Sequence, residues 1–118
     1  MNYVLELEGC VVPKARPRGN NKGTFYTQTS YRLWKEEAIA HLRQQQPPLK
    51  LSGVRLDVVL EGKHSRRGDA DNIIGSLMDA LVQAGILAND NLVCVTGISL
   101  ELNYNQDNPK TYIAISPA

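Results

Sequence analysis

Three absences narrow the classes to which this 118-residue chain can belong. The sequence has only two cysteines, Cys10 and Cys94, and both lie in apolar runs that predict strands with buried, reduced thiols. The two histidines, His41 and His64, stand apart from them, which excludes a zinc site of the usual spacing. No apolar run approaches membrane length and no signal peptide is recognisable, so a cytoplasmic protein without a membrane partner is expected. A chain of this size forms one domain and needs no disulfide bonds to bury a core.

A strong charge bias is also missing, because the net charge is only +1. The basic residues are nevertheless concentrated, and seven of the 13 fall in two segments that contain no acidic residue. Two such segments on a neutral chain indicate binding to a polyanion such as DNA, although two solvated loops would have the same composition. The seven candidate DNA-binding residues are Lys14, Arg16, Arg18, Lys22, Lys63, Arg66 and Arg67.

Carboxylates follow the second basic segment directly. In an extended chain Asp69 and Asp71, two residues apart, point the same way and can face one ion. A later carboxylate, Asp90, precedes an apolar run. Each aspartate alone has a structural explanation, as a helix cap, as an ion-pair partner of Arg66 or as a turn residue. Together, beside cations that can bind phosphate, they predict a Mg²⁺ site for phosphodiester chemistry, with Mn²⁺ as an alternative ion.

The hydrophobic pattern predicts six elements in the order β-α-β-α-β-β. A first strand over 3–8 continues toward Val11 and Val12, and residues 13–29 are expected to form a loop, with a short strand possible at 24–27. Thr29 or Ser30 is the expected N-cap of a helix over 31–46 that Pro47 and Pro48 end. The remaining elements are a half-buried strand at 53–61, an amphipathic helix from about 72 to 86 with Gly85 at its end, an interior strand at 92–102 and a last strand at 111–115.

These elements predict a single α+β (α/β-like) domain over residues 1–118. It has a mixed sheet with two helices on one face and a terminal hairpin.

Two segments of the sequence match the pattern of a known family. One is Pro13-Lys14-Ala15-Arg16-Pro17-Arg18 followed by Tyr26-Thr27. The other runs from Asp69-x-Asp71-Asn72 through Asp79-Ala80-Leu81 and Ala84-Gly85-Ile86-Leu87 to Asp90 and Val93. In both segments the sequence resembles the RusA family of Holliday-junction resolvases. The resemblance implies a homodimeric, Mg²⁺-dependent endonuclease that nicks a four-way DNA junction symmetrically. It also implies that Asp69, Asp71 and Asp90 bind the metal and take part in catalysis, with Asn72 and Asp79 in supporting positions.

Two positions depart from the family pattern. Family members usually carry a lysine four residues after the second aspartate, where this chain has Gly75, and their paired aspartates are here Asn89 and Asp90. The first departure raises the alternative of a junction-binding protein with weak or absent cleavage, in which Lys63, Arg66 or Arg67 replaces the missing charge. A third alternative is a small-molecule or regulatory domain whose aspartates only cap helices.

The predicted second helix also constrains the metal site. A helix from about 72 to 86 is roughly 20 Å long, and Asp71 and Asp90 lie near its opposite ends. The two cannot share an ion within one chain unless the linker folds back. A two-fold dimer that pairs these helices antiparallel would bring Asp90 of one copy to Asp69 and Asp71 of the other.

Overall fold

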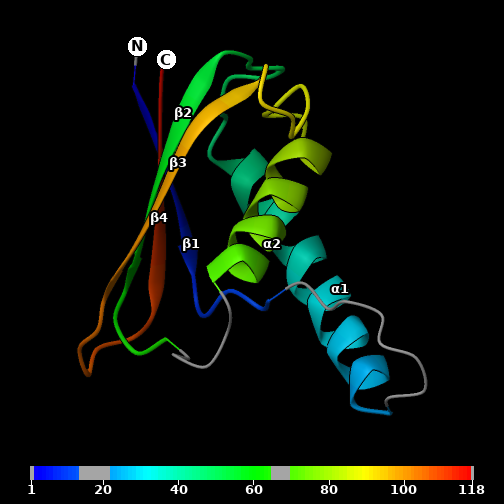
Figure 1. Ribbon diagram of the computed structural model, residues 1–118. Helices are drawn as coiled ribbons and strands as arrows, with labels where there is room; N and C mark the ends of the chain where they lie inside the picture. Colours follow the sequence, from blue (N-terminus) through cyan, green and yellow to red (C-terminus); the bar gives the residue numbers. More distant parts are fainter. Residues whose placement is uncertain (1, 14–21, 65–69, 118) are drawn as a thin grey trace.

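The computed structural model describes residues 2–13, 22–64 and 70–117, with side chains described in the same ranges except at 22–28. The elements follow one another as β1 (Tyr3–Glu8), α1 (Lys22–Gln44), β2 (Val54–Glu61), α2 (Ala70–Gln83), β3 (Val95–Asn103) and β4 (Lys110–Pro117). The strands form one mixed sheet, and both helices cover the same face of it (Figure 1). The predicted α+β class and element order are therefore confirmed.

The strand order β1-β4-β2-β3 contradicts the predicted terminal hairpin. Strand β4 does not pair with β3, but lies between β1 and β2 and is antiparallel to both. Its residues Ile113 and Ile115 are almost completely buried, as the centre of a sheet requires. Alternation in a sequence shows that a strand exists, but not which strand it pairs with.

Strand β3 is an edge strand, which contradicts the prediction of an interior strand. It pairs only with β2, in parallel, and α2 makes the connection between them. The residues that suggested burial on both faces, Leu92 and Val93, precede β3, and they are 85% and 75% exposed. Their apolar character belongs to a surface turn rather than to the sheet.

Helix α1 begins by Lys22, so the predicted loop at 22–29 and the predicted strand at 24–27 are wrong. Thr29 and Ser30 are helical and do not cap the helix. The reason is that residues such as Thr, Tyr and Gly are at most about 1 kcal/mol less favourable than Ala in a helix, so a segment that contains them can still be helical. The helix ends at Gln44, two residues before the predicted end, and Pro47 and Pro48 follow as expected.

Helix α2 packs an apolar face that includes Ile73, Leu77 and Leu81 against the core. It ends at Gln83, not near Ile86, and the predicted role of Gly85 is confirmed. Gly85 has a φ of 83°, and its N–H donates to Val82 O while Ile86 N–H donates to Leu81 O. These two bonds satisfy carbonyls that would otherwise be left unpaired at the helix end.

The two ends of α2 define two ends of the molecule (Figure 1). The start end holds the first turn of α2 together with the chain after β1 and after β2, and the finish end holds the turn that leads from α2 to β3. Within the part of the chain that the structure describes, no helix is long and apolar enough to cross a membrane. Cys94 is buried, but Cys10 is exposed and follows β1, so the prediction of burial in a strand is wrong for Cys10.

Candidate metal and DNA-binding site

Three of the described members of the predicted site lie at the start end. Asp71 is exposed in the first turn of α2, and Asn72 beside it is half-buried. Lys63 is exposed just beyond β2. Asp69 and the basic residues Lys14, Arg16, Arg18, Arg66 and Arg67 lie outside the described residues, as does the side chain of Lys22.

The chain that leaves β2 is fixed as far as His64. Gly62 N–H donates to Asn103 O at 3.0 Å, and Lys63 N–H donates to Asp107 O at 3.0 Å. His64 is 5% exposed, and its Nε2 lies 3.1 Å from Glu61 O and 2.9 Å from Lys110 O. Because both partners are carbonyl oxygens, Nε2 must carry the proton and donate. His64 was not among the predicted site residues, and an isolated histidine after a strand gives no sequence signal for this role.

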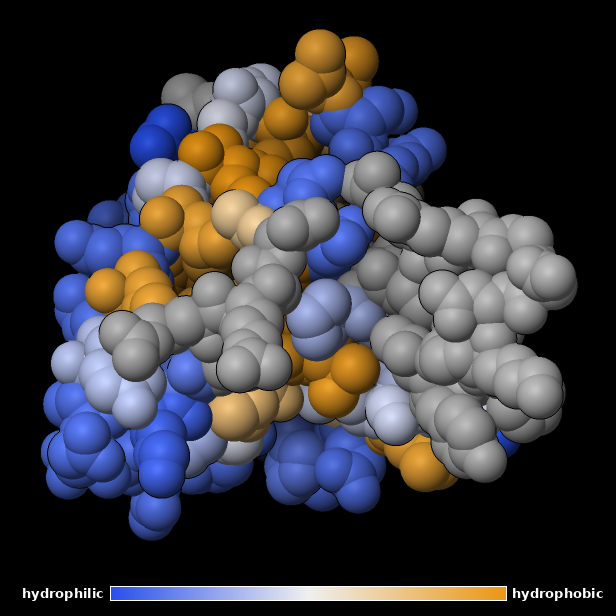
Figure 2. All heavy atoms as spheres, turned by 60° about the horizontal axis from the view of Figure 1, so that its bottom comes forward, coloured by the Kyte–Doolittle hydropathy of each residue, from blue (hydrophilic) through white to orange (hydrophobic). Residues whose placement is uncertain are grey.

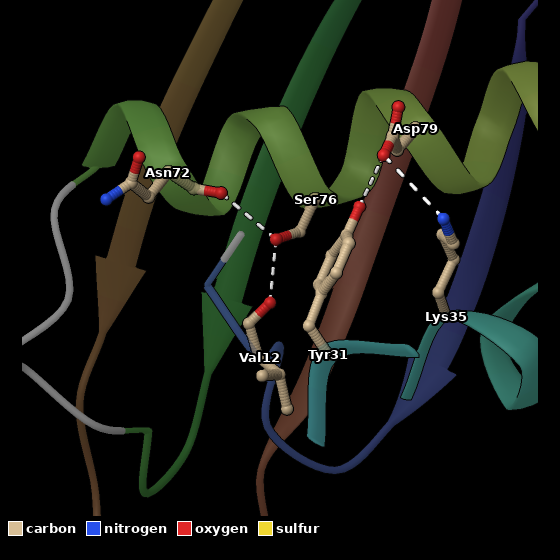
Figure 3. Close-up of polar contacts among 6 residues, drawn as sticks. All are labelled: Val12, Tyr31, Lys35, Asn72, Ser76 and Asp79. Carbon is tan, nitrogen blue, oxygen red and sulfur yellow. Dashed lines mark hydrogen bonds and ion pairs between the residues drawn. The ribbon is translucent and has the colours of Figure 1, made fainter. Parts of the chain in front are cut away.

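Ser76 connects α2 to the chain that follows β1 (Figure 3). It is completely buried, and its Oγ lies 2.7 Å from Val12 O and 3.0 Å from Asn72 O. The contact with Asn72 lies within the helix, but that with Val12 joins residues 64 positions apart. Val12 and Pro13 are the last described residues before the first basic segment of the sequence, and this bond holds Val12 against α2.

Asp79 lies two helical turns beyond Asp71, where α2 contacts α1. The hydroxyl of Tyr31 donates a hydrogen bond to Asp79 Oδ2 at 2.6 Å, and Lys35 Nζ is 3.9 Å from the same oxygen (Figure 3). Burial and the hydrogen bond to this carboxylate raise the pKa of Tyr31 above its ordinary value, so the hydroxyl keeps its proton. These contacts give Asp79 a part in joining the helices.

Asp90 lies at the finish end, in a turn that side-chain hydrogen bonds hold. Asn89 Oδ1 accepts a bond from Asp90 N–H at 2.7 Å, and Asn91 Oδ1 accepts bonds from the N–H groups of Val93 and Cys94, each at 3.1 Å. Asp90 itself is exposed. Residues 72–83 of α2 lie between Asp71 and the end of the helix, a rise of about 18 Å at 1.5 Å per residue.

The donor chemistry suits Mg²⁺, because Asp71 and Asp90 present exposed carboxylates and hard cations prefer such oxygen ligands. The described residues place these two carboxylates at different ends of the molecule. Over residues 2–13, 22–64 and 70–117, no group of three or more His, Cys, Asp and Glu side chains could hold a metal ion.

The outer face of the sheet, which the helices leave uncovered, is unsuited to DNA. Alternation along the strands puts five acidic and two basic residues on this face, so its formal charge is −3. A face of this sign repels a polyanion. The residues are Glu6, Glu8, Asp57, Glu61 and Glu101 against Arg55 and Lys110.

Comparison with known proteins identifies the family of this chain. The family model described as "Endodeoxyribonuclease RusA" matches residues 8–116. The "Crossover junction endodeoxyribonuclease RusA" of Aquifex aeolicus (strain VF5) is 32% identical over 94 residues, which cover 75% of this chain and 72% of that protein. The family match includes all of α1 and α2 and the turn that carries Asp90. This chain belongs to the RusA family of endodeoxyribonucleases.

Proposed function

We propose that this chain is a Mg²⁺-dependent, homodimeric endodeoxyribonuclease that resolves four-way (Holliday) junctions in DNA recombination and repair by paired, symmetric nicks. Membership of the RusA family supports the nuclease activity, and the name of the Aquifex relative supports the junction as substrate. The observation that carries the dimer is that residues 72–83, most of α2, separate Asp71 from the turn that holds Asp90. Two copies paired antiparallel along α2 would complete two equivalent sites.

The proposed site would hold the ion between Asp69 and Asp71 of one copy and Asp90 of the other. The metal, when bound, would polarise the phosphodiester and supply an activated water. The role of Asp71 is supported by its exposure in the first turn of α2, the helix that Ser76 ties to Val12. The basic residues of the two segments would bind the flanking phosphates. These are Lys14, Arg16, Arg18, Lys22, Lys63, Arg66 and Arg67. The acidic outer face of the sheet would keep DNA to the helical side of the molecule.

Subunit mixing tests the shared site. Asp71→Asn and Asp90→Asn should each abolish nicking of a synthetic four-way junction in Mg²⁺. A mixed dimer of these two variants would have one site that lacks both aspartates and one site that is intact. Co-refolded mixtures should therefore nick one strand only, at up to half the wild-type rate per dimer. If each chain held its own complete site, no mixture of the two variants would recover any activity.

A second candidate function, junction binding with weak cleavage, rests on Gly75. It lies on α2 one turn beyond Asp71 and has no side chain to contact DNA or a leaving group. Gly75→Lys should raise the single-turnover nicking rate at least tenfold if the absent cation limits cleavage. Gly75→Ala is the matched control, since it gives a similar gain in helix propensity without charge. Equal rates for wild type, Gly75→Ala and Gly75→Lys would exclude this second candidate.

A further inference from the structure

The connection between β3 and β4 contacts the chain where it leaves β1 and where it leaves β2. Its Pro109 carbonyl accepts a hydrogen bond from Gly9 N–H at 2.9 Å, just beyond β1. Its Asp107 carbonyl accepts one from Lys63 N–H at 3.0 Å, just beyond β2. In the sequence, the first of these stretches leads to the first basic segment and the second leads to the paired aspartates. One connection therefore holds the chain at the start of both.

His64 adds the side-chain contact at the end of β2. Its ring is 5% exposed, and Nε2 donates to Glu61 O, at the end of β2, and to Lys110 O, at the start of β4, over 3.1 and 2.9 Å. The backbone N–H of His64 donates to Gly62 O at 3.0 Å, which makes a tight turn. Because the ring is buried and bonded to two strands, it fixes the point at which the chain leaves the sheet.

We propose that His64 is a positioning residue for the metal site, which holds the chain that carries Asp69 and Asp71 ready for the ion. The inference rests on the proposed function and assigns a residue that acts on its site without binding the metal. Five residues join His64 to Ala70, where α2 begins. Fixing both ends of a segment this short lowers the conformational entropy that is lost when its side chains bind a ligand.

The first test is the affinity of the full-length protein for Mn²⁺, measured without DNA from the EPR signal of the unbound ion. His64→Leu fills the same space without a donor. We expect it to bind Mn²⁺ about fivefold more weakly, the factor that corresponds to ordering roughly one residue on binding. His64→Gln should bind like wild type, because the glutamine amide carries N–H donors that can replace Nε2–H.

The second test is the dependence of nicking on Mg²⁺ concentration. In His64→Leu the half-saturating concentration should rise by the same factor, while the rate at saturating Mg²⁺ stays within about twofold of the wild-type rate. A change that only lowered the amount of folded protein would reduce the rate at every Mg²⁺ concentration and leave the half-saturating concentration unchanged. Circular dichroism gives the folded fraction of each variant at the assay temperature.

The matched control is Gln45→Leu, which also removes a side chain that bonds the backbone of a strand. The amide of Gln45 accepts from Glu6 N–H at 2.9 Å and donates to Glu6 O at 2.7 Å. This contact lies on β1, at the edge of the sheet opposite β3. Gln45→Leu should therefore lose stability but keep the wild-type affinity for Mn²⁺.

An independent variant changes the connection instead of the ring. Asn105 Oδ1 accepts the Asp107 N–H at 2.8 Å, so Asn105→Ala removes a bond that shapes the connection. It should weaken Mn²⁺ binding in the same direction as His64→Leu, and it carries the test if His64→Leu does not fold.

Each outcome supports or overturns the inference. Wild-type affinity for Mn²⁺ in a folded His64→Leu overturns it, while the subunit-mixing experiment still decides the proposed function. Equal weakening in Gln45→Leu assigns the effect to general destabilisation and also overturns it. Weaker binding in His64→Leu and Asn105→Ala, with recovery in His64→Gln, supports it. A wild-type protein that neither binds Mn²⁺ nor nicks a junction refutes both proposals.

Discussion

Two buried hydroxyl groups show how differently a single polar residue can act in this fold. The hydroxyl of Ser76 is completely buried and contacts two carbonyl oxygens, one of which belongs to the distant residue Val12. Thr111 is just as buried, in the central strand β4, but its Oγ1 has no hydrogen-bond partner among the described residues. A buried polar group stabilises the fold only when it is paired. The first hydroxyl therefore joins two parts of the site, and the second only lowers stability.

Ser76→Ala should lower the free energy of unfolding by about 1–3 kcal/mol, because it leaves the Val12 carbonyl without its side-chain donor. It should also weaken junction binding, since the bond positions the chain just before Lys14. Urea unfolding and a titration with labelled junction measure the two effects. Ser52→Ala is the control, because that exposed hydroxyl contacts only Cys94 Sγ, at 3.4 Å. A Ser76→Ala variant with wild-type stability would show that the contact contributes nothing.

Thr111→Val should raise the free energy of unfolding by about 1 kcal/mol, because valine has the same shape and removes an unpaired buried hydroxyl. Thermal unfolding should shift upward by a few degrees. Thr96→Val is the comparison, since the Thr96 hydroxyl donates to Val54 O at 3.4 Å and the residue is exposed on β3. That variant should gain nothing. If Thr111→Val were destabilised, the hydroxyl must have a partner, such as a buried water.

At the scale of elements, the backbone at the end of β2 lies in close contact with the backbone of the connection between β3 and β4. Gly62 has a φ of 96°, and a Cβ built on it would lie 2.5 Å from Asn108 O. No L-residue tolerates that approach to a backbone oxygen without moving the chain. The contact joins β2, which leads to Asp69 and Asp71, to the connection between β3 and β4. The position of the chain at the end of β2 therefore depends on packing between backbones.

Gly62→Ala should destabilise the protein by more than 2 kcal/mol, because it adds a backbone clash to the strain of a positive φ. Gly53→Ala isolates the strain alone, since Gly53 has a φ of 66° and no atom within 4 Å of the added Cβ. It should cost about 1 kcal/mol. Denaturant unfolding of both variants gives the difference. Equal losses in the free energy of unfolding for the two variants would mean that the connection containing Asn108 moves away from the added Cβ at little cost.

Much of the fold could be predicted from the sequence because its elements are locally consistent. Three local patterns predict their elements from a few neighbouring residues. They are the alternation of apolar and polar residues in β2, the apolar stripe of α2 and Gly85 at the end of α2. Pairing partners are set by contacts far apart in sequence, so the insertion of β4 between β1 and β2 could not be predicted. The start of α1 was missed because Thr and Gly residues favour loops only weakly. In the site, the separation of Asp71 from Asp90 was predicted, whereas the ties made by Ser76 and His64 were not.

The whole molecule is polarised, which explains why a chain of net charge +1 can act on DNA. The acidic outer face of the sheet points away from the helices, and in the sequence the two basic segments are continuous with residues that lie at the start end. The finish end carries the carboxylate of Asp90 close in sequence to two exposed apolar side chains, Leu92 and Val93. In an antiparallel pair, the finish end of one copy would meet the start end of the other. Metal binding and dimerisation would then be one linked equilibrium.

If the ion is held by carboxylates from two copies, Mg²⁺ must tighten the dimer. A ligand at 100 times its dissociation constant stabilises the state that binds it by about 2.7 kcal/mol per site, so we expect dimerisation at least tenfold tighter in Mg²⁺ than in EDTA. Asp90→Asn should lose this tightening but still dimerise in EDTA as well as wild type, because the amide removes repulsion from Asp71. Asp107→Asn, an exposed aspartate in the connection between β3 and β4, should keep it. Sedimentation equilibrium of the three proteins measures the dimer dissociation constant in Mg²⁺ and in EDTA. A wild-type dissociation constant that is the same in both would contradict a site shared between copies.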